Sequence, residues 1–271
     1  DFFNNKGKHC ASVSSPVPIG KVIWMNQVNM SDDKKIYLAS RIIEGKIKNQ
    51  LNLIKYYHKY HKNEYELKDR YTITSEQLTL LLDKIKKTEF FINSYQEKLI
   101  AIEAQAANTY WAYIRQLLDD DNIDFEKRVR QGASDLFNSM LNYGYAILYS
   151  RIWQALLAAK LNPSVGILHK PVHNKPTLAF DLIELFRSQV VDRIVISLIQ
   201  TKQPLAIDNK GLLEEKTKQL LSKNVLERLN RYEKFRKQEL RFDEIIKIQA
   251  RDLAKYINEE KKSFLPYIAK W

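Results

Sequence analysis

The sequence has 271 residues, of which 45% are hydrophobic, so it can bury the core of one large domain or two modest ones. Its seven glycines and seven prolines are too few for an all-β fold rich in tight turns or for a disordered chain, and no apolar run approaches the roughly 18–20 residues of a membrane span. The net charge of +12 fits a polyanionic partner, either nucleic acid or a membrane surface, although it would also serve solubility alone.

Residues 1–30 have the pattern of strands. Two short apolar stretches, residues 10–13 and 22–25, are separated by a turn rich in Ser and Pro. Because two strands do not form a stable sheet alone, we interpret this segment as the remnant of an N-terminal β-domain. The sequence does not start with Met, and we expect most of that β-domain to lie outside it.

From Ser31 onward, apolar residues recur at helical spacing. Helices are predicted over residues 31–62, from 74, over 93–118, 132–160, 176–187 and 190–199, and within 211–260. The helix at 132–160 is apolar on nearly every face, which is typical of a buried central helix. The predicted fold is therefore mainly α, with an all-helical domain over residues 31–271 behind the truncated β-domain.

The positive charge is concentrated at the two ends of the chain. Residues 1–90 carry 16 Lys and Arg against 10 Asp and Glu, residues 91–209 carry 12 of each, and residues 210–271 carry 16 against 10. The single cysteine, Cys10, excludes a disulfide within the chain and predicts a reducing cytoplasm. The first residues also lack the pattern of a secretory signal.

Asp181 and Glu184 are three residues apart on one predicted helix, so both face the same side. Two close carboxylates with a nearby histidine suit a hard or borderline divalent cation. The alternative is structural, because acidic residues in the first turns of a helix stabilise its dipole.

Glu103 and His169 stand in apolar surroundings. Glu103 lies in a stretch of Ala and Ile, where a buried carboxylate needs a cation, a proton or a metal. His169 follows a turn containing Pro and Gly, where a histidine is more often a hydrogen-bonded structural residue than a metal ligand. Spacing alone does not bring the two together.

Two basic segments have the composition of nucleic-acid contacts. Arg128 and Arg130 precede a helix start, a place that suits phosphate; the alternative is a capping motif with Ser134 or Asp135 as the cap. Residues 56–62 mix Tyr, His and Lys, a composition that can stack on and neutralise single-stranded nucleic acid. For that second segment we favour a solvated helix face.

Several separate blocks of this sequence closely resemble the CRISPR-associated integrase of the adaptation module (the Cas protein one family). The blocks are residues 46–50, 102–111, 132–148, 161–169 and 177–193. Their order and spacing over about residues 40–200 make the resemblance specific. It is greatest to a branch that is often fused behind a reverse transcriptase. The resemblance implies an N-terminal β-domain followed by a helical catalytic domain, in agreement with the elements above.

The resemblance also implies roles for individual residues. The family's metal-binding and catalytic residues fall on Glu103, His169 and Glu184. Asp181 would lie near the site, and Tyr145 would line it. The residues implied to contact nucleic acid are Arg128, Arg130, Lys170, Arg187 and Arg193.

The reaction implied is CRISPR spacer acquisition by transesterification, in which a DNA 3′-hydroxyl attacks a phosphodiester at the edge of a CRISPR repeat. The implied cofactor is a divalent metal, magnesium or manganese. The implied partners are prespacer and repeat DNA, a second copy of the chain in a homodimer, the second adaptation subunit (Cas protein two) and a fused reverse transcriptase. No membrane partner is expected, and the compartment would be a prokaryotic cytoplasm.

Two rival functions are compatible with the same residues. The first is a metal-dependent, structure-selective nuclease whose products are only shortened strands. The second is a basic DNA-binding scaffold without catalysis, in which the acidic residues are structural. Joined strands would distinguish an integrase from the nuclease, and an effect of metal on thermal stability would distinguish both from the scaffold.

Overall fold

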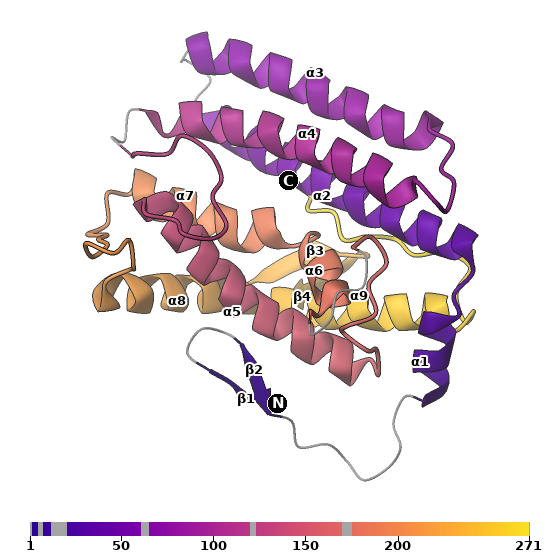
Figure 1. The fold of residues 1–271 in the computed structure, drawn as a ribbon. Coiled ribbons are helices and arrows are strands. Elements are labelled where there is room, and N and C mark those ends of the chain that lie inside the picture. The colour runs from indigo at the N-terminus through magenta and orange to yellow at the C-terminus, as the bar shows by residue number, and fades with distance from the viewer. Residues whose placement is uncertain are drawn as a thin grey trace.

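The structure, a computed structural model, describes residues 2–4, 8–11, 21–60, 65–119, 123–169 and 175–270. Helices dominate it (Figure 1), which confirms the predicted mainly α fold. The elements in chain order are β1 (Phe2–Phe3), β2 (His9–Ala11), α1 (Lys21–Val28), α2 (Asp32–Tyr60), α3 (Tyr65–Lys87), α4 (Tyr95–Leu117), α5 (Leu136–Ala158), α6 (Thr177–Ile183), the π-helical turn η2 (Ser188–Asp192), α7 (Arg193–Gln200), α8 (Glu215–Asn230), β3 (Tyr232–Phe235), β4 (Gln238–Arg241) and α9 (Phe242–Ile257).

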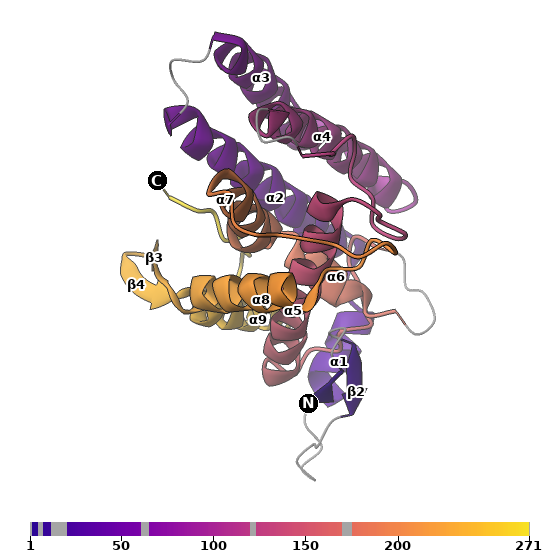
Figure 2. The same cartoon turned by 90° about the vertical axis from the view of Figure 1, so that its left-hand side faces the viewer.

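The helices form two layers with a short connecting segment between them. Helices α2, α3 and α4 pack side by side as one layer, and α5, α8 and α9 form the other (Figures 1 and 2). The turn η2 contacts α2 on one side and α5 and α8 on the other. Within the described ranges, no helix has the length and apolar character needed to cross a membrane.

The apolar core lies between the two layers. Ile42 of α2, Leu148 of α5 and Val191 of η2 are fully buried. As predicted, α5 is a buried central helix, although it begins at Leu136 rather than at residue 132. It begins there because the Asp135 side chain accepts a hydrogen bond from the Asn138 N–H at 2.8 Å. Of the two cap candidates in the sequence, Asp135 is the one used.

The predicted strand at residues 22–25 is wrong, because this segment lies in helix α1. Contacts distant in sequence select the helix: Trp24 Nε1 donates to the Lys160 carbonyl at 2.9 Å, and Gln27 Nε2 donates to the Asn162 carbonyl at 2.8 Å. Of the earlier apolar stretch, Cys10 and Ala11 do lie in a strand, β2, which pairs antiparallel with β1. The domain boundary near residue 30 stays a prediction.

Two other elements differ from prediction. Helix α3 begins at Tyr65, well before Thr74. Strands β3 and β4 form an antiparallel hairpin with Tyr232 opposite Arg241, inside a region predicted to be helical. The domain is thus mainly helical rather than all-helical.

Candidate active site

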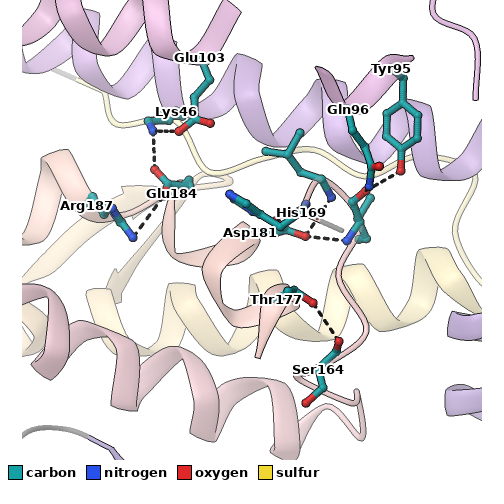
Figure 3. A network of polar contacts seen from close by, with 12 residues as sticks. Lys46, Tyr95, Gln96, Glu103, Ser164, His169, Thr177, Asp181, Glu184 and Arg187 are labelled. Carbon is teal, nitrogen blue, oxygen red and sulfur yellow. Dashed lines mark hydrogen bonds and ion pairs between the residues drawn. The ribbon is translucent and has the colours of Figure 1, made fainter. Parts of the chain in front are cut away.

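Three ionisable side chains from separate parts of the chain meet at a buried point. Lys46, in the middle of α2, directs its Nζ atom to Glu103 of α4 and to Glu184, which follows α6 (Figure 3). The Nζ atom lies 2.6 Å from Glu184 Oε2 and also bonds Glu103 Oε1. All three residues are less than a tenth exposed, at 7% for Lys46, 7% for Glu103 and 4% for Glu184. Two buried carboxylates therefore share one buried cation.

The electrostatics of this cluster favour the charged forms of Glu184 and Lys46. Burial would raise the pKa of Glu184, but the positive charges of Arg187 and Lys46 outweigh this effect and lower the pKa to about 2. Burial would lower the pKa of Lys46, yet Glu184 and Glu103 together raise it. The Arg187 Nη2 atom lies 3.3 Å from Glu184 Oε1, so Glu184 sits between two cations. Its carboxylate stays ionised across the physiological range of pH.

Asp181 holds the loop that carries His169. The carboxylate is fully buried and accepts hydrogen bonds from the N–H groups of Ile167 at 2.6 Å, Leu168 at 3.0 Å and His169 at 3.2 Å. It also lies 2.6 Å from His169 Nδ1 (Figure 3). The hydrogen bond to Asp181 raises the pKa of His169. Asp181 thus positions the imidazole through its Nδ1 side.

Two adjoining cavities open beside Glu184. The first, which we call the arginine cavity, has a volume of about 220 Å³ and contains Lys46, Tyr145 and Asp192 in its wall. The second, the histidine cavity, has a volume of about 580 Å³ and contains His169. Arg130, Glu184 and Arg187 line both. Glu103 lines neither and lies behind Lys46.

The basic wall of the arginine cavity is fixed by hydrogen bonds at the start of α5. Arg128 donates to the Asn138 side chain at 2.9 Å and to the Asn142 side chain at 2.6 Å. Arg130 is exposed at the rim. The Arg128 and Arg187 guanidinium groups both approach the Tyr145 ring, at 5.3 Å and 4.7 Å from its centroid. Positive charge is therefore held in place along this wall of the cavity.

Asp192, the last residue of η2, forms the far wall. Its carboxylate accepts hydrogen bonds from the hydroxyl groups of Tyr145 at 2.5 Å and Tyr110 at 2.9 Å. Burial raises the pKa of Asp192 although both tyrosines bond it. The next residue, Arg193, faces a different cavity, where its guanidinium group lies 4.5 Å from the centroid of the Tyr56 ring.

The structure brings most of the predicted site residues together. Glu184, Arg187, Tyr145, Arg128 and Arg130 line the arginine cavity, and His169 lies in the adjoining one. Glu103 joins them through Lys46, and Asp181 joins them through His169. Arg193 is the exception among the described residues, because it lines a separate cavity. Lys170 lies outside the described residues.

Sequence reasoning missed Lys46 and Asp192 as parts of the site. A signal for Lys46 was present: it stands on the apolar face of α2, four residues after Ile42 and three before the buried Asn49. A lysine on such a face needs a buried anion, as Glu103 needed a cation. Asp192 gave a similar signal inside the apolar run 190–199.

The donor atoms fit a divalent metal. In the described part of the chain, no three His, Cys, Asp or Glu side chains are gathered around one point in this conformation. However, Glu103 and Glu184 already share a cation, and His169 bonds Asp181 through Nδ1 rather than Nε2. A carboxylate that orients an imidazole is common behind metal-binding histidines, and the carboxylate oxygens of Glu103 and Glu184 are the ligand type that suits magnesium or manganese.

Known proteins match this chain in sequence and in fold. The family model described as CRISPR associated protein Cas1 matches residues 1–234. A CRISPR-associated endonuclease Cas1 from Archaeoglobus fulgidus is 30% identical over 100% of this chain and 82% of its own length. A casposase bound to its integration product has the same fold, with a TM-score of 0.79, 23% identity and coverage of 96% of this chain and 75% of the casposase. A chain of a Cas6-RT-Cas1–Cas2 complex matches with a TM-score of 0.77 and 22% identity, covering 99% of this chain and 29% of that one.

Proposed function

This chain belongs to the CRISPR-associated Cas1 family, and from that membership we propose that it is a metal-dependent DNA integrase and endonuclease of spacer acquisition. The observation that supports this most is the meeting of Glu103, Glu184 and Lys46 beside two cavities walled by arginines. Arginines fixed beside a cavity can stabilise the negative charge that develops on a phosphate in the transition state, and the carboxylates offer oxygen ligands for a metal.

The proposed reaction is a transesterification. The oxygen of a DNA 3′-hydroxyl forms a bond to a phosphorus atom at the edge of a CRISPR repeat, the bond from that phosphorus to the outgoing strand breaks, and the proton of the attacking hydroxyl passes to the leaving oxygen through solvent. Glu103, His169 and Glu184 would hold magnesium or manganese, which supplies a Lewis acid at the phosphate oxygens.

The other residues of the site act on charge and position. Arg187 and Arg130 line both cavities, so they can neutralise a phosphate lying beside Glu184. Asp181 keeps the His169 ring in one orientation through its bond to Nδ1. Arg128 and Tyr145 pack against each other in the wall of the arginine cavity, where they would cover one side of the phosphate.

The comparisons also support a set of partners. The casposase of similar fold is described as bound to its integration product, and the solved complex contains Cas2 and a reverse transcriptase. We therefore include prespacer and repeat DNA, Cas protein two and a fused reverse transcriptase among the partners proposed. A second copy of this chain is a further proposal, which rests on the family resemblance of the sequence. The basic cavities described above supply the charge that a DNA partner needs.

A strand-transfer assay tests the proposal. A labelled branched DNA that mimics a half-joined intermediate is incubated with the protein and manganese, and Glu103→Gln is compared with Glu76→Gln, which changes an exposed carboxylate on α3. We expect joined product from the wild type and from Glu76→Gln, and a loss of more than about a hundredfold in Glu103→Gln, because a metal supplies several kcal/mol to the transition state.

Two results would contradict this expectation in different ways. Shortened strands without joined strands, again lost in Glu103→Gln, would identify a structure-selective nuclease. DNA binding without any product, and without a change in thermal unfolding temperature when manganese is added, would identify a scaffold.

A further inference from the structure

A third cavity lies between the C-terminal end of α2 and helices α7 and α8, with α7 between the other two in Figure 2. It has a volume of about 370 Å³ and shares no lining residue with the arginine or histidine cavity. We call it the tyrosine cavity. Its lining includes Tyr56, Tyr57, Tyr60, Arg193, Arg228 and Arg231.

The charge of the tyrosine cavity is one-sided. Three arginines line it, and none of its lining residues in the described part of the chain is acidic. Glu233 pairs with Arg228 from outside the lining, and Arg193 stacks on the Tyr56 ring. A cavity with an excess of guanidinium groups attracts an anion with several acceptor oxygens, and phosphate is the best match.

Arg228 is the strongest single indication of a ligand. It is only 3% exposed, its Nε atom donates to the Gln189 carbonyl at 2.9 Å, and its Nη1 atom bonds Glu233. Its Nη2 atom is buried and has no hydrogen-bond acceptor among the described residues. Burial lowers the pKa of this guanidinium. A buried donor without an acceptor is costly, and the Phe242 ring, 4.9 Å from the Arg228 guanidinium carbon, offsets only part of that cost. An anion in the cavity that Arg228 lines would supply the missing acceptor.

Aromatic rings at the mouth of the cavity indicate what the anion is attached to. Tyr60 is 66% exposed and stands edge-on to Tyr56, with 5.1 Å between ring centroids. An exposed ring beside a phosphate site is the arrangement on which single-stranded bases stack, whereas paired bases keep their faces covered. The volume lies within the range of ligand pockets and is far below what a duplex would need.

We propose that the tyrosine cavity is a second nucleic-acid site, which holds one backbone phosphate of a single strand between its arginines and stacks the neighbouring base on Tyr60. This goes beyond the reaction proposed above and does not use its carboxylates. The Tyr- and Lys-containing segment that we interpreted as a solvated helix face thus acquires a role for its described part. Its residues 61 and 62 lie outside the described residues.

Binding of a fluorescent thymidine hexanucleotide, measured without metal, tests the proposal. Tyr60→Ala is expected to weaken binding about five- to tenfold, since stacking of one base contributes about 1 kcal/mol or more. Arg231→Ala should reduce the slope of log affinity against log salt by about 0.7, the value for one phosphate contact on a single strand. Matched controls are Tyr232→Ala and Lys234→Ala, both exposed on β3 beside the cavity but outside its lining, and neither should change binding.

A photo-crosslinking arm locates the strand. An oligonucleotide with 5-iododeoxyuridine should crosslink within residues 56–60, and inorganic phosphate or thymidine monophosphate should compete weakly. Crosslinks confined to the arginine and histidine cavities, with Tyr60→Ala binding like the wild type, would overturn the proposal. Competition by thymidine monophosphate at concentrations as low as those at which the hexanucleotide binds would also overturn it, because the ligand would then be a free nucleotide. Because no arm needs strand transfer, a failure of the reaction proposal gives a different result from a failure here.

Discussion

Lys46 pairs with Glu103 and Glu184, the two carboxylates that are also proposed to bind a metal. Replacing Lys46 therefore removes the ion pairs and leaves both carboxylates available to the metal. Lys46→Met should lower the free energy of unfolding by about 3–5 kcal/mol, because Glu103 and Glu184 lose their buried cation. Added manganese should then raise the unfolding temperature more in Lys46→Met than in the wild type, since the ion no longer competes with the ammonium group. Thermal unfolding with and without manganese measures both effects.

Lys48→Met is the matched control, because Lys48 pairs with Glu44 at 2.5 Å on the same helix and Arg41 also bonds Glu44 at 2.7 Å. Its effect should stay below about 1 kcal/mol and should not depend on metal. An equal response of the two variants to manganese would contradict a metal site at Glu103 and Glu184.

At the scale of residues, the sequence indicated part of the site through a charged residue in an apolar stretch. Glu103 in an apolar stretch predicted a need for a cation, a proton or a metal, and the structure pairs it with the cation Lys46. Its partner could not be identified, because Lys46 lies 57 residues earlier and only the packing of α2 against α4 joins them. The roles of the other residues came from the resemblance, because spacing alone did not separate Asp181 from Glu184. The two carboxylates are three residues apart, yet Asp181 bonds the loop that carries His169 and Glu184 bonds Lys46 of α2.

At the scale of elements, the close packing of α5 on η2 depends on Gly144. A Cβ atom there would lie 2.5 Å from Val191 Cγ1, and Val191 is fully buried. Gly144→Ala should therefore lower the free energy of unfolding by about 1–3 kcal/mol through overcrowding. Chemical denaturation measures the loss, and the double variant with Val191→Ala should recover part of it. A loss that is the same with either residue at position 191 would place the cause elsewhere.

The sequence predicted the bounds of helices that have a long run of periodic apolar residues. It did not predict elements whose conformation is set by distant contacts or by an unusual turn. Helices α2 and α4 follow their periodic residues closely. The β3–β4 hairpin was missed because its two-residue turn is Arg236–Lys237, both with positive φ, instead of the Asn-Gly or Asp-Gly that usually marks such a turn. Helix α1 was missed because Lys160 and Asn162, which select it, are distant in sequence.

At the scale of the whole molecule, we expect the contribution of the net charge of +12 to DNA affinity to depend on which surface carries the basic residues. Arg130 is exposed at the rim that the arginine and histidine cavities share. If it contacts one phosphate of duplex DNA, Arg130→Ala should reduce the slope of log affinity against log salt by about 0.9. Titration of duplex DNA at several salt concentrations measures this slope. Lys223→Ala, which removes an exposed charge on α8, is the control. An equal reduction of the slope in this variant would show that DNA responds to the net charge of the protein and not to the place of Arg130.

One peptide bond separates Asp192, in the wall of the arginine cavity, from Arg193, in the wall of the tyrosine cavity. The two residues belong to one continuous helical segment, η2 followed by α7, so a displacement of that segment alters both walls together. Thermodynamic linkage then makes the effect reciprocal: whatever factor a strand in one cavity applies to affinity in the other, it receives in return. We therefore expect a strand bound in one of the two cavities to change the affinity of the other cavity for its own strand.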